Sequence, residues 1–216
     1  MKFTSLFLLL SVLTLSFIAA PAWADTIAVT NPSFEMVDPL SLTQTAPGYG
    51  IWNNGPISGW TISGGGAGSW QPGPAAFTSV PDGKTVAYSN GATLSQTLNA
   101  SLSPDTTYTL SVDVGHRLDG LATNYTIELL AGSMLLNSLG GSNGVITPGT
   151  FQNEFFGFTT GTSIPSTDPL TIELISAGAQ TDFDNVRLTA SPVPEPGTLA
   201  LLGTGLGLMF LVLRRR

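Results

Sequence analysis

Side chains suited to acid–base or nucleophilic catalysis are few in this sequence of 216 residues. His116 is the only histidine, so any catalytic triad built on histidine would have to include it. Glu128, Glu154 and Glu173 lie in stretches where apolar and polar residues alternate, and outward-facing strand positions explain them more simply than paired catalytic carboxylates. Because no group of residues meets the criteria for a catalytic site, the sequence predicts a protein that is not an enzyme.

Aromatic residues make a better case for a binding site. Trp52, Trp60 and Trp70 lie in a segment rich in glycine, proline and serine. Exposed aromatic faces commonly stack on sugar rings, and nearby polar side chains add hydrogen bonds. Trp52 and Trp70 are therefore candidate ligand-binding residues, with His116 and Arg117 as further candidates. The alternative is that the rings pack in a core, which we expect for Trp60 because it lies in the strand-like stretch I-S-G-W-T-I.

The elements that must position these residues are β-strands. In residues 107–115, Tyr108, Leu110 and Val112 alternate with polar residues, which is the pattern of a half-buried strand. Similar alternation occurs in residues 124–132, 151–160, 169–176 and 182–189. Turn-forming clusters separate these stretches, and the body shows no sustained helical period. This organisation predicts an all-β domain with antiparallel sheets, folded as a sandwich or barrel.

The first third of the body is less regular than the rest. Residues 36–81 are dense in Gly, Pro and Ser, and the stretch S-G-G-G-A-G at 63–68 lacks the lysine and spacing of a phosphate-binding loop. We expect residues 63–68 to be a flexible connection. No internal repeat or linker divides the body, so a single domain over residues 25–190 is predicted.

The body is strongly acidic and contains no cysteine. Residues 25–190 hold three basic residues against thirteen acidic ones, a net charge of −10. Nucleic acid is excluded as a partner because binding its phosphates requires clustered basic side chains. Without disulfides, the domain must depend on core packing, with or without a metal ion.

The N-terminal residues carry the features of an export signal. Lys2 precedes a long apolar run, and Pro21 is followed by the small residues Ala22 and Ala24 at the positions that signal peptidase recognises. We predict that residues 1–24 form a signal peptide that is cleaved after Ala24. The protein is therefore expected to leave the cytoplasm.

Five stretches of the body occur in the order seen in galactose-binding-like jelly-roll domains: residues 29–35, 57–63, 81–98, 103–115 and 183–188. The body resembles this superfamily, which contains many carbohydrate-binding modules, and it is similar to the plant cell-wall domains of the DUF642 type. The resemblance implies two packed antiparallel sheets forming a β-sandwich of the jelly-roll type. It does not identify a ligand, because one fold serves many functions.

The same resemblance implies a structural calcium site. In similar carbohydrate-binding modules, calcium often lies between a glutamate of the first strand and a late aspartate, which correspond to Glu35 and Asp184. Calcium prefers hard oxygen ligands and would join the two ends of a domain without cysteines. The alternative is that Glu35 is solvated and that Asp184 and Asn185 shape a bend.

The C-terminal segment has the features of a membrane anchor. Residues 198–213 form an uncharged stretch of sixteen residues, which as a helix would span about 24 Å. Arg214, Arg215 and Arg216 follow it and are expected to stay on the cytoplasmic side, leaving the domain in the periplasm. A transmembrane helix is therefore predicted at the C-terminus.

The motif in front of this helix indicates sorting as well as anchoring. Pro194, Glu195 and Pro196, the hydrophobic segment and the terminal arginines together look like the PEP-CTERM sorting signal of Gram-negative bacteria that make exopolysaccharide. The resemblance, which covers residues 191–216, implies recognition by an exosortase and removal of the tail. The motif residues would then be substrate residues of that enzyme. A plain membrane anchor is the alternative.

Two hypotheses for the body follow from these observations. The first is a non-catalytic carbohydrate-interacting module whose partner is the exopolysaccharide of a biofilm. The protein would be held first at the inner membrane and then at the cell surface or in the extracellular matrix. The second is a structural, glycosylated matrix protein that recognises no specific sugar.

Overall fold

The computed structural model describes residues 24–193 and Arg214, and Ala24–Pro192 form one compact unit. Two short 3-10 helices are present in this part, η1 (Pro39–Ser41) and η2 (Asn143–Val145). The strands are β1 (Asp25–Ile27), β2 (Gln44–Ala46), β3 (Gly50–Trp52), β4 (Thr61–Pro72), β5 (Val86–Ser101), β6 (Thr106–His116), β7 (Asn124–Ala131), β8 (Met134–Ser142), β9 (Thr150–Thr159), β10 (Pro169–Ser176) and β11 (Gln180–Pro192). The described domain is therefore all-β, as predicted.

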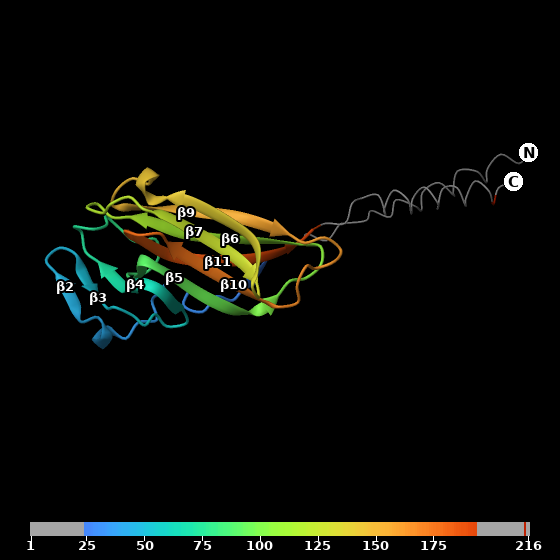
Figure 1. Ribbon diagram of the computed structural model, residues 1–216, viewed down its shortest axis with the longest axis horizontal. Helices are drawn as coiled ribbons and strands as arrows, with labels where there is room; N and C mark the ends of the chain where they lie inside the picture. The colour runs from blue at the N-terminus through green and yellow to red at the C-terminus, as the bar shows by residue number, and fades with distance from the viewer. Residues whose placement is uncertain (1–23, 194–213, 215–216) are drawn as a thin grey trace, which may run out of the picture. The chain divides into compact units, whose positions relative to one another are not determined.

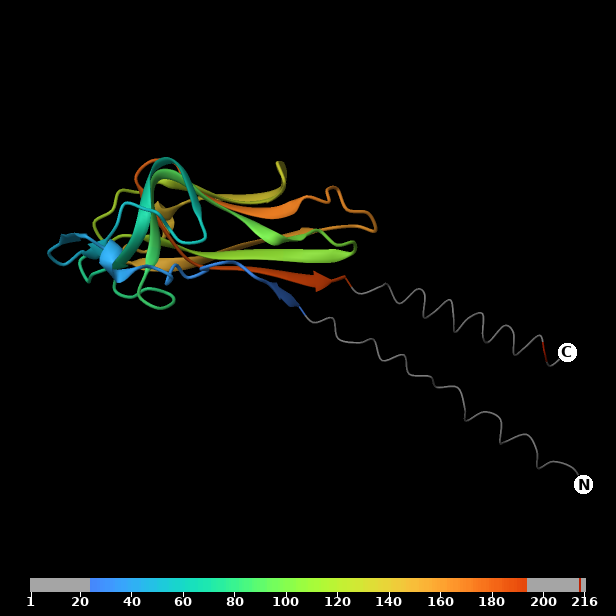
Figure 2. The same ribbon diagram turned by 90° about the horizontal axis from the view of Figure 1, so that it is seen from below.

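Strand β5 joins the two layers of the fold because it pairs with different strands along its length. Its first part, from Ala87 to Asn90, pairs with β11, and its second part, from Thr93 to Ser101, pairs with β10. One layer continues from β10 through β7 to β8, and the other from β11 to β6 and β9. These pairings are antiparallel, and the views in Figures 1 and 2 show the layers facing each other.

Apolar side chains at alternate strand positions fill the space between the layers. Leu110 of β6 and Leu188 of β11 meet Ile127 of β7 and Ile172 and Leu174 of β10 in one core cluster. Burial of each such side chain contributes roughly 1.5–3 kcal/mol. The alternation recognised in the sequence therefore marks the residues that hold the sandwich together.

Trp60 lies in the interior, as the sequence predicts, and Gln96 is a polar residue of the interior. Trp60 is buried, and its ring centroid lies 5.5 Å from that of Phe34. Gln96 is also buried on β5, where its Oε1 accepts from the Thr30 backbone N–H at 2.7 Å. Its Nε2 donates to the carbonyl oxygens of Thr30 and Gly59, both at 2.9 Å. The inward amide therefore satisfies backbone groups that no apolar side chain could serve.

The expected flexible connection at residues 63–68 is wrong. These residues belong to β4, which pairs with β5 from Thr61 to Trp70. Their small size has a packing reason, because a Cβ at Gly68 would overlap the backbone oxygen of Asn53. Glycine here permits close approach of a neighbouring segment within a sheet, a role that composition alone does not distinguish from a loop.

Both ends of the described domain lie at one end of the sandwich. Asp25 of β1 is paired with Ala190 of β11, and Thr106 at the start of β6 is paired with Pro192. Figure 2 shows β1 and β11 side by side at this end. The last residue of β6, His116, and the first residue of β11, Gln180, lie at the opposite end, where β2 and β3 are also found.

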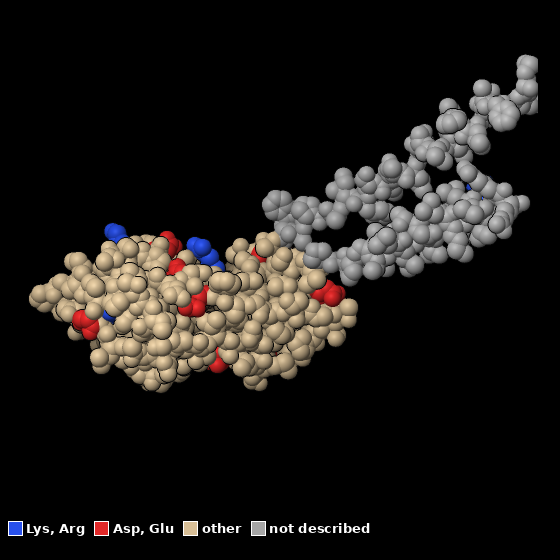
Figure 3. Space-filling view, turned by 90° about the horizontal axis from the view of Figure 1, so that it is seen from above, with Lys and Arg blue, Asp and Glu red and all other residues tan. Residues whose placement is uncertain are grey.

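Charged residues are sparse on the face drawn in Figure 3, with isolated acidic and basic side chains among uncharged ones. Within residues 24–193 and at Arg214, no helix has the length and apolar character needed to cross a membrane. The predicted transmembrane helix at 198–213, the sorting motif Pro194–Glu195–Pro196 and Arg215 and Arg216 lie outside the described residues. Most of the predicted signal peptide lies outside them as well.

Candidate functional site

A pocket of about 380 Å³ lies at the end of the sandwich opposite to the chain ends. Four aromatic residues line it: Tyr49, Trp52, Trp70 and Tyr88. Trp52 and Trp70 are paired across β3 and β4, and the indole N–H of Trp70 donates to the Tyr49 carbonyl oxygen at 2.8 Å. The Tyr88 hydroxyl donates to Asn53 O at 2.7 Å or to Asn54 Oδ1 at 2.8 Å. These contacts fix the walls of the pocket.

The pocket exists because an additional apolar cluster covers the outer face of the sheet at this end. Trp70, Phe77, Val86 and Tyr88 pack together there, and Phe151 packs against them. The ring centroids of Trp70 and Phe77 are 5.8 Å apart, and those of Phe77 and Phe151 are 4.6 Å apart. These side chains on the outer face of the sheet, which a simple two-layer sandwich would leave exposed to solvent, are therefore buried by one another.

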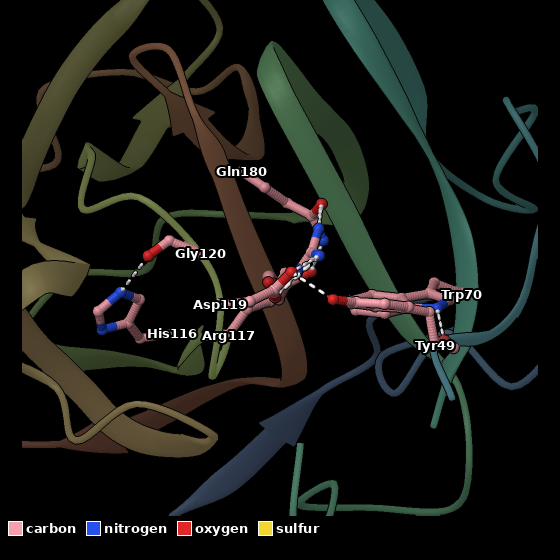
Figure 4. A network of polar contacts seen from close by, with 8 residues as sticks. Tyr49, Trp70, His116, Arg117, Asp119, Gly120 and Gln180 are labelled. Atoms are coloured by element: carbon pink, nitrogen blue, oxygen red, sulfur yellow. Dashed lines mark hydrogen bonds and ion pairs between the residues drawn. The ribbon is translucent and has the colours of Figure 1, made fainter. Parts of the chain in front are cut away.

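The polar side of the pocket is built around Arg117. Its guanidinium pairs with Asp119 at 2.9 Å and donates through Nη1 to Gln180 Oε1 at 2.7 Å. It also lies over the rings of Tyr49 and Trp70, with its Cζ 5.4 Å and 5.3 Å from their centroids. Figure 4 shows Arg117 between Gln180 and Asp119, with the Tyr49 hydroxyl donating to Asp119 at 2.8 Å.

Asp182 lies next to this network in the middle of the sheet. It is paired with Tyr88 of β5 on one side and with Gly115 of β6 on the other, so its carboxyl shares a sheet face with the Tyr88 ring. Phe151 is paired with Gly115 and covers the space that a side chain there would occupy. Two aromatic rings therefore flank the carboxyl group.

The environment of Asp182 suits a proton donor. The residue is fully buried, and its Oδ1 accepts from Gln180 Nε2 at 2.6 Å. Among the residues that the structure describes, no group forms a hydrogen bond with Oδ2. Burial raises the pKa of the carboxyl to about 7, although the hydrogen bond from Gln180 and the charge of Arg117 oppose the shift. A carboxyl group with such a pKa retains its proton near neutral pH and can act as a general acid.

The sequence-based candidates divide between two places. Trp52, Trp70 and Arg117 line the pocket together. His116 does not, because it is buried with Nδ1 3.1 Å from the carbonyl oxygen of Ile146 and Nε2 3.3 Å from that of Gly120. Figure 4 shows His116 turned away from the Arg117 network. His116 is the last residue of β6, and Arg117 follows it outside the strand, where its side chain turns to the pocket.

Sequence reasoning missed Asp182 as a functional residue. The signal available was the pattern D-F-D at 182–184, in which Phe183 is a core residue and both aspartates lie on the other face. Such positions are normally exposed to solvent. The two aspartates are buried because other segments of the chain pack over this end of the sheet.

Glu35 and Asp184 contact the same loop, residues 81–85. The Glu35 carboxylate accepts from the backbone N–H groups of Lys84 and Thr85, and Asp184 Oδ2 accepts from Asp82 N at 3.1 Å. Asn185 has a φ of 54° at an irregularity of β11, so these residues do shape a bend. Within the described residues, no three His, Cys, Asp or Glu side chains are grouped so that they could hold a metal ion. Calcium at Glu35 and Asp184 stays a prediction.

The calcium prediction has a direct test. The charges of Asp113 and Asp82 add to burial in raising the pKa of Asp184 to about 7, so a cation at this place would relieve repulsion. We expect millimolar calcium to raise the melting temperature of the purified domain by several degrees relative to a chelator, and Glu35→Gln to remove the difference. Equal melting temperatures of the wild-type domain with calcium and with chelator would contradict the prediction.

Comparisons with known proteins identify the family of the body. The family model described as HpiC1 cyclase matches residues 25–189. The chain belongs to the HpiC1-like cyclase family. A crystal structure of the Stig cyclase FisC from Fischerella sp. TAU, in complex with (3Z)-3-(1-methyl-2-pyrrolidinylidene)-3H-indole, is 30% identical over 79% of this chain and 99% of that chain, with a TM-score of 0.65.

Other solved structures are also similar to the chain. A cyclase from Fischerella sp. TAU in complex with 4-(1H-indol-3-yl)butan-2-one is 30% identical over 78% of this chain and 98% of that chain, with a TM-score of 0.64. TmCBM61, a structure in complex with β-1,4-galactotriose, is 16% identical over 76% of this chain and 98% of that chain, with a TM-score of 0.48. No curated protein matches the chain significantly.

The family assignment corrects two predictions from the sequence. The body is HpiC1-like and does not belong to the DUF642 type. The prediction that the protein is not an enzyme is wrong, because the HpiC1-like family and the similar solved structures are cyclases. That prediction rested on the single histidine and on the lack of a recognisable catalytic motif, neither of which excludes cyclase chemistry.

The sorting prediction is confirmed. A second family model, for the PEP-CTERM protein-sorting motif, matches residues 192–216. The motif implies export from a Gram-negative cell, membrane-associated sorting and processing by an exosortase. The HpiC1-like domain therefore belongs to an exported protein.

Proposed function

We propose that the HpiC1-like domain is an exported cyclase in which Asp182 donates a proton to an unsaturated substrate bound in the aromatic pocket. The observation that carries the proposal is the buried Asp182 carboxyl, which does not itself line the pocket but accepts a hydrogen bond from the pocket residue Gln180, while its other oxygen is unpartnered among the described residues. The relative's bound indole compounds suggest a substrate with a planar, electron-rich ring. A pocket walled by Tyr49, Trp52, Trp70 and Tyr88 suits such a ring.

The proposed reaction is a cyclisation without change of mass. The Oδ2 proton of Asp182 moves to one carbon of a double bond, the O–H bond breaks and a carbocation forms at the neighbouring carbon. An electron-rich carbon of the same substrate attacks the cation and closes the ring, and loss of a proton to the Asp182 carboxylate restores the acid. The rings of Trp52 and Tyr88, which also line the pocket, stabilise the transient positive charge.

The proposal is tested with the purified domain, residues 25–193, and a panel of indoles and phenols that each carry an alkene side chain. We expect the wild-type domain to convert at least one compound into a cyclic isomer of equal mass, detected by liquid chromatography, mass spectrometry and NMR. Asp182→Asn should not form it, whereas Asp168→Asn, which changes an exposed acid, should. Product formation by Asp182→Asn at the wild-type rate would contradict the assignment of the acid.

Binding to exopolysaccharide is a second candidate function for the same pocket. It is favoured by the sorting motif and by Trp52 and Trp70, which lie side by side in paired strands. Against it, Trp70 is only 4% exposed and Arg117 lies over its ring, so little of that face is free to stack on a sugar. In a pull-down with insoluble polysaccharides, we expect retention no greater than that of a Trp52→Ala variant. Retention that depends on Trp52 would favour the carbohydrate function.

A further inference from the structure

We infer that the pocket selects a substrate in which a chain attached to the ring carries an oxygen acceptor, a carbonyl or a carboxylate. This acceptor binds Arg117, and the pocket discriminates against substrates whose chain carries an ammonium group. This inference deepens the proposed function, since it concerns the substrate of the same site. It rests on the polar contacts of Arg117 and Asn54 and is independent of whether Asp182 is the acid.

The position that a cationic ligand would take is already filled. Aromatic walls such as those of Tyr49 and Trp70 attract cations to their faces. In this chain the guanidinium of Arg117 lies over both rings, at 5.4 Å and 5.3 Å from their centroids. An ammonium group of a substrate would meet a fixed positive charge there.

The guanidinium has hydrogen-bonding capacity left for a ligand. Of its five N–H groups, Nε and one on Nη2 donate to Asp119 at 3.1 Å and 3.0 Å, and one on Nη1 donates to Gln180 at 2.7 Å. Nη2 lies near both Asp119 oxygens, at 2.9 Å from Oδ1 and 3.0 Å from Oδ2, so within the described part of the chain the second N–H of Nη1 is the donor left for a ligand. Because Asp119 and Gln180 leave this N–H unused, a neutral carbonyl and a carboxylate can both accept from it.

Asn54 adds donors on the other side of the pocket. Its Oδ1 lies 2.8 Å from the Tyr88 hydroxyl, which can donate to it or to Asn53 O, and its NH₂ group donates to no group in the described part of the chain. Gln180 also lines the pocket, but its Oε1 is bound by Arg117 and its Nε2 by Asp182. The donors of Arg117 and Asn54 therefore complement a ligand that accepts, whereas Asn90, which also lines the pocket, can both donate and accept.

The test uses three indoles with chains of similar length that differ in their end groups. The probes are 4-(1H-indol-3-yl)butan-2-one, indole-3-butyric acid and 3-(1H-indol-3-yl)propan-1-amine, titrated into the purified domain by calorimetry. We expect the ketone and the acid to bind at least about tenfold more tightly than the amine. If both oxygen ligands bind, the shared chemistry is the carbonyl acceptor, and if only the acid binds, the charge is required.

Two variants connect the preference to the named residues. Arg117→Met should abolish the preference for the oxygen ligands over the amine, and Asn54→Asp, which replaces donors by an acceptor, should weaken binding of the acid about tenfold. Melting curves establish that each variant is folded. Equal binding of the amine and the acid by the wild-type domain, or an unchanged preference in folded Arg117→Met, would overturn the inference. Asp182→Asn should keep the preference, so loss of turnover in that variant with preserved selectivity separates this test from that of the proposed function.

Discussion

Replacement of Asp182 by asparagine is expected to lower the rate of cyclisation by at least about 100-fold, because general acid catalysis contributes roughly 10²–10⁴ in rate. The amide has nearly the same shape as the carboxyl, so the contact with Gln180 and the packing against Tyr88 can persist. Turnover should fall while binding of the indole probes changes little. Rates under saturating substrate and calorimetric binding constants measure the two effects.

The pH dependence of turnover supplies an independent check on this residue. Since burial raises the pKa of Asp182 to about 7, the wild-type rate should be high below that pH and decline above it. Asp168→Asn, the exposed control, should keep the wild-type profile. A rate that rises with pH through 7 would contradict the role of Asp182 as the acid.

The free energy of unfolding should also depend on pH, and it should fall as the pH rises from about 4 to about 7. Burial raises the pKa of Asp182 and of Asp184 from 3.8 to about 7, so between these values the folded protein holds protons that the unfolded chain releases. The stabilising contribution is therefore complete below about pH 4 and is lost as the pH rises to 7. At about 1.4 kcal/mol per pKa unit, the loss is on the order of several kcal/mol.

Denaturant unfolding at pH 5 and pH 8 measures this effect. The free energy of unfolding should be smaller at pH 8, and Asp182→Asn should reduce the difference because its side chain does not titrate. At pH 8 that variant should be at least as stable as the wild-type domain. Indistinguishable pH dependence in the two proteins would show that Asp182 does not hold a proton in the folded state.

The sequence predicted the parts of the fold that depend on local pattern. Strands β6, β7 and β10 were recognised because apolar residues alternate along them, as in Tyr125, Ile127 and Leu129. Strand β4 was missed because its glycines, Gly68 among them, serve close packing against a neighbouring segment. That requirement arises from tertiary contacts, which a local pattern does not contain.

The candidate site was only partly predictable for a related reason. Trp52, Trp70 and Arg117 could be nominated by residue type, since exposed aromatic and basic groups are common in binding sites. Asp182 gave no such signal, because its strand position is outward-facing and its burial depends on Tyr88 and Phe151, which flank it through tertiary contacts. Fold resemblance suggested sugar binding, whereas the buried acid and the HpiC1-like family point to chemistry.

The central claim is that Asp182 delivers a proton to carbon, and isotope labelling tests it most directly. The wild-type domain is equilibrated in D₂O and given the panel compound that it converts, so that the carboxyl of Asp182 carries deuterium. The account predicts a cyclic product one mass unit heavier than the substrate, labelled at a single carbon, and no such product from Asp182→Asn. A cyclic product that contains no deuterium, or one formed equally by Asp182→Asn, would contradict it.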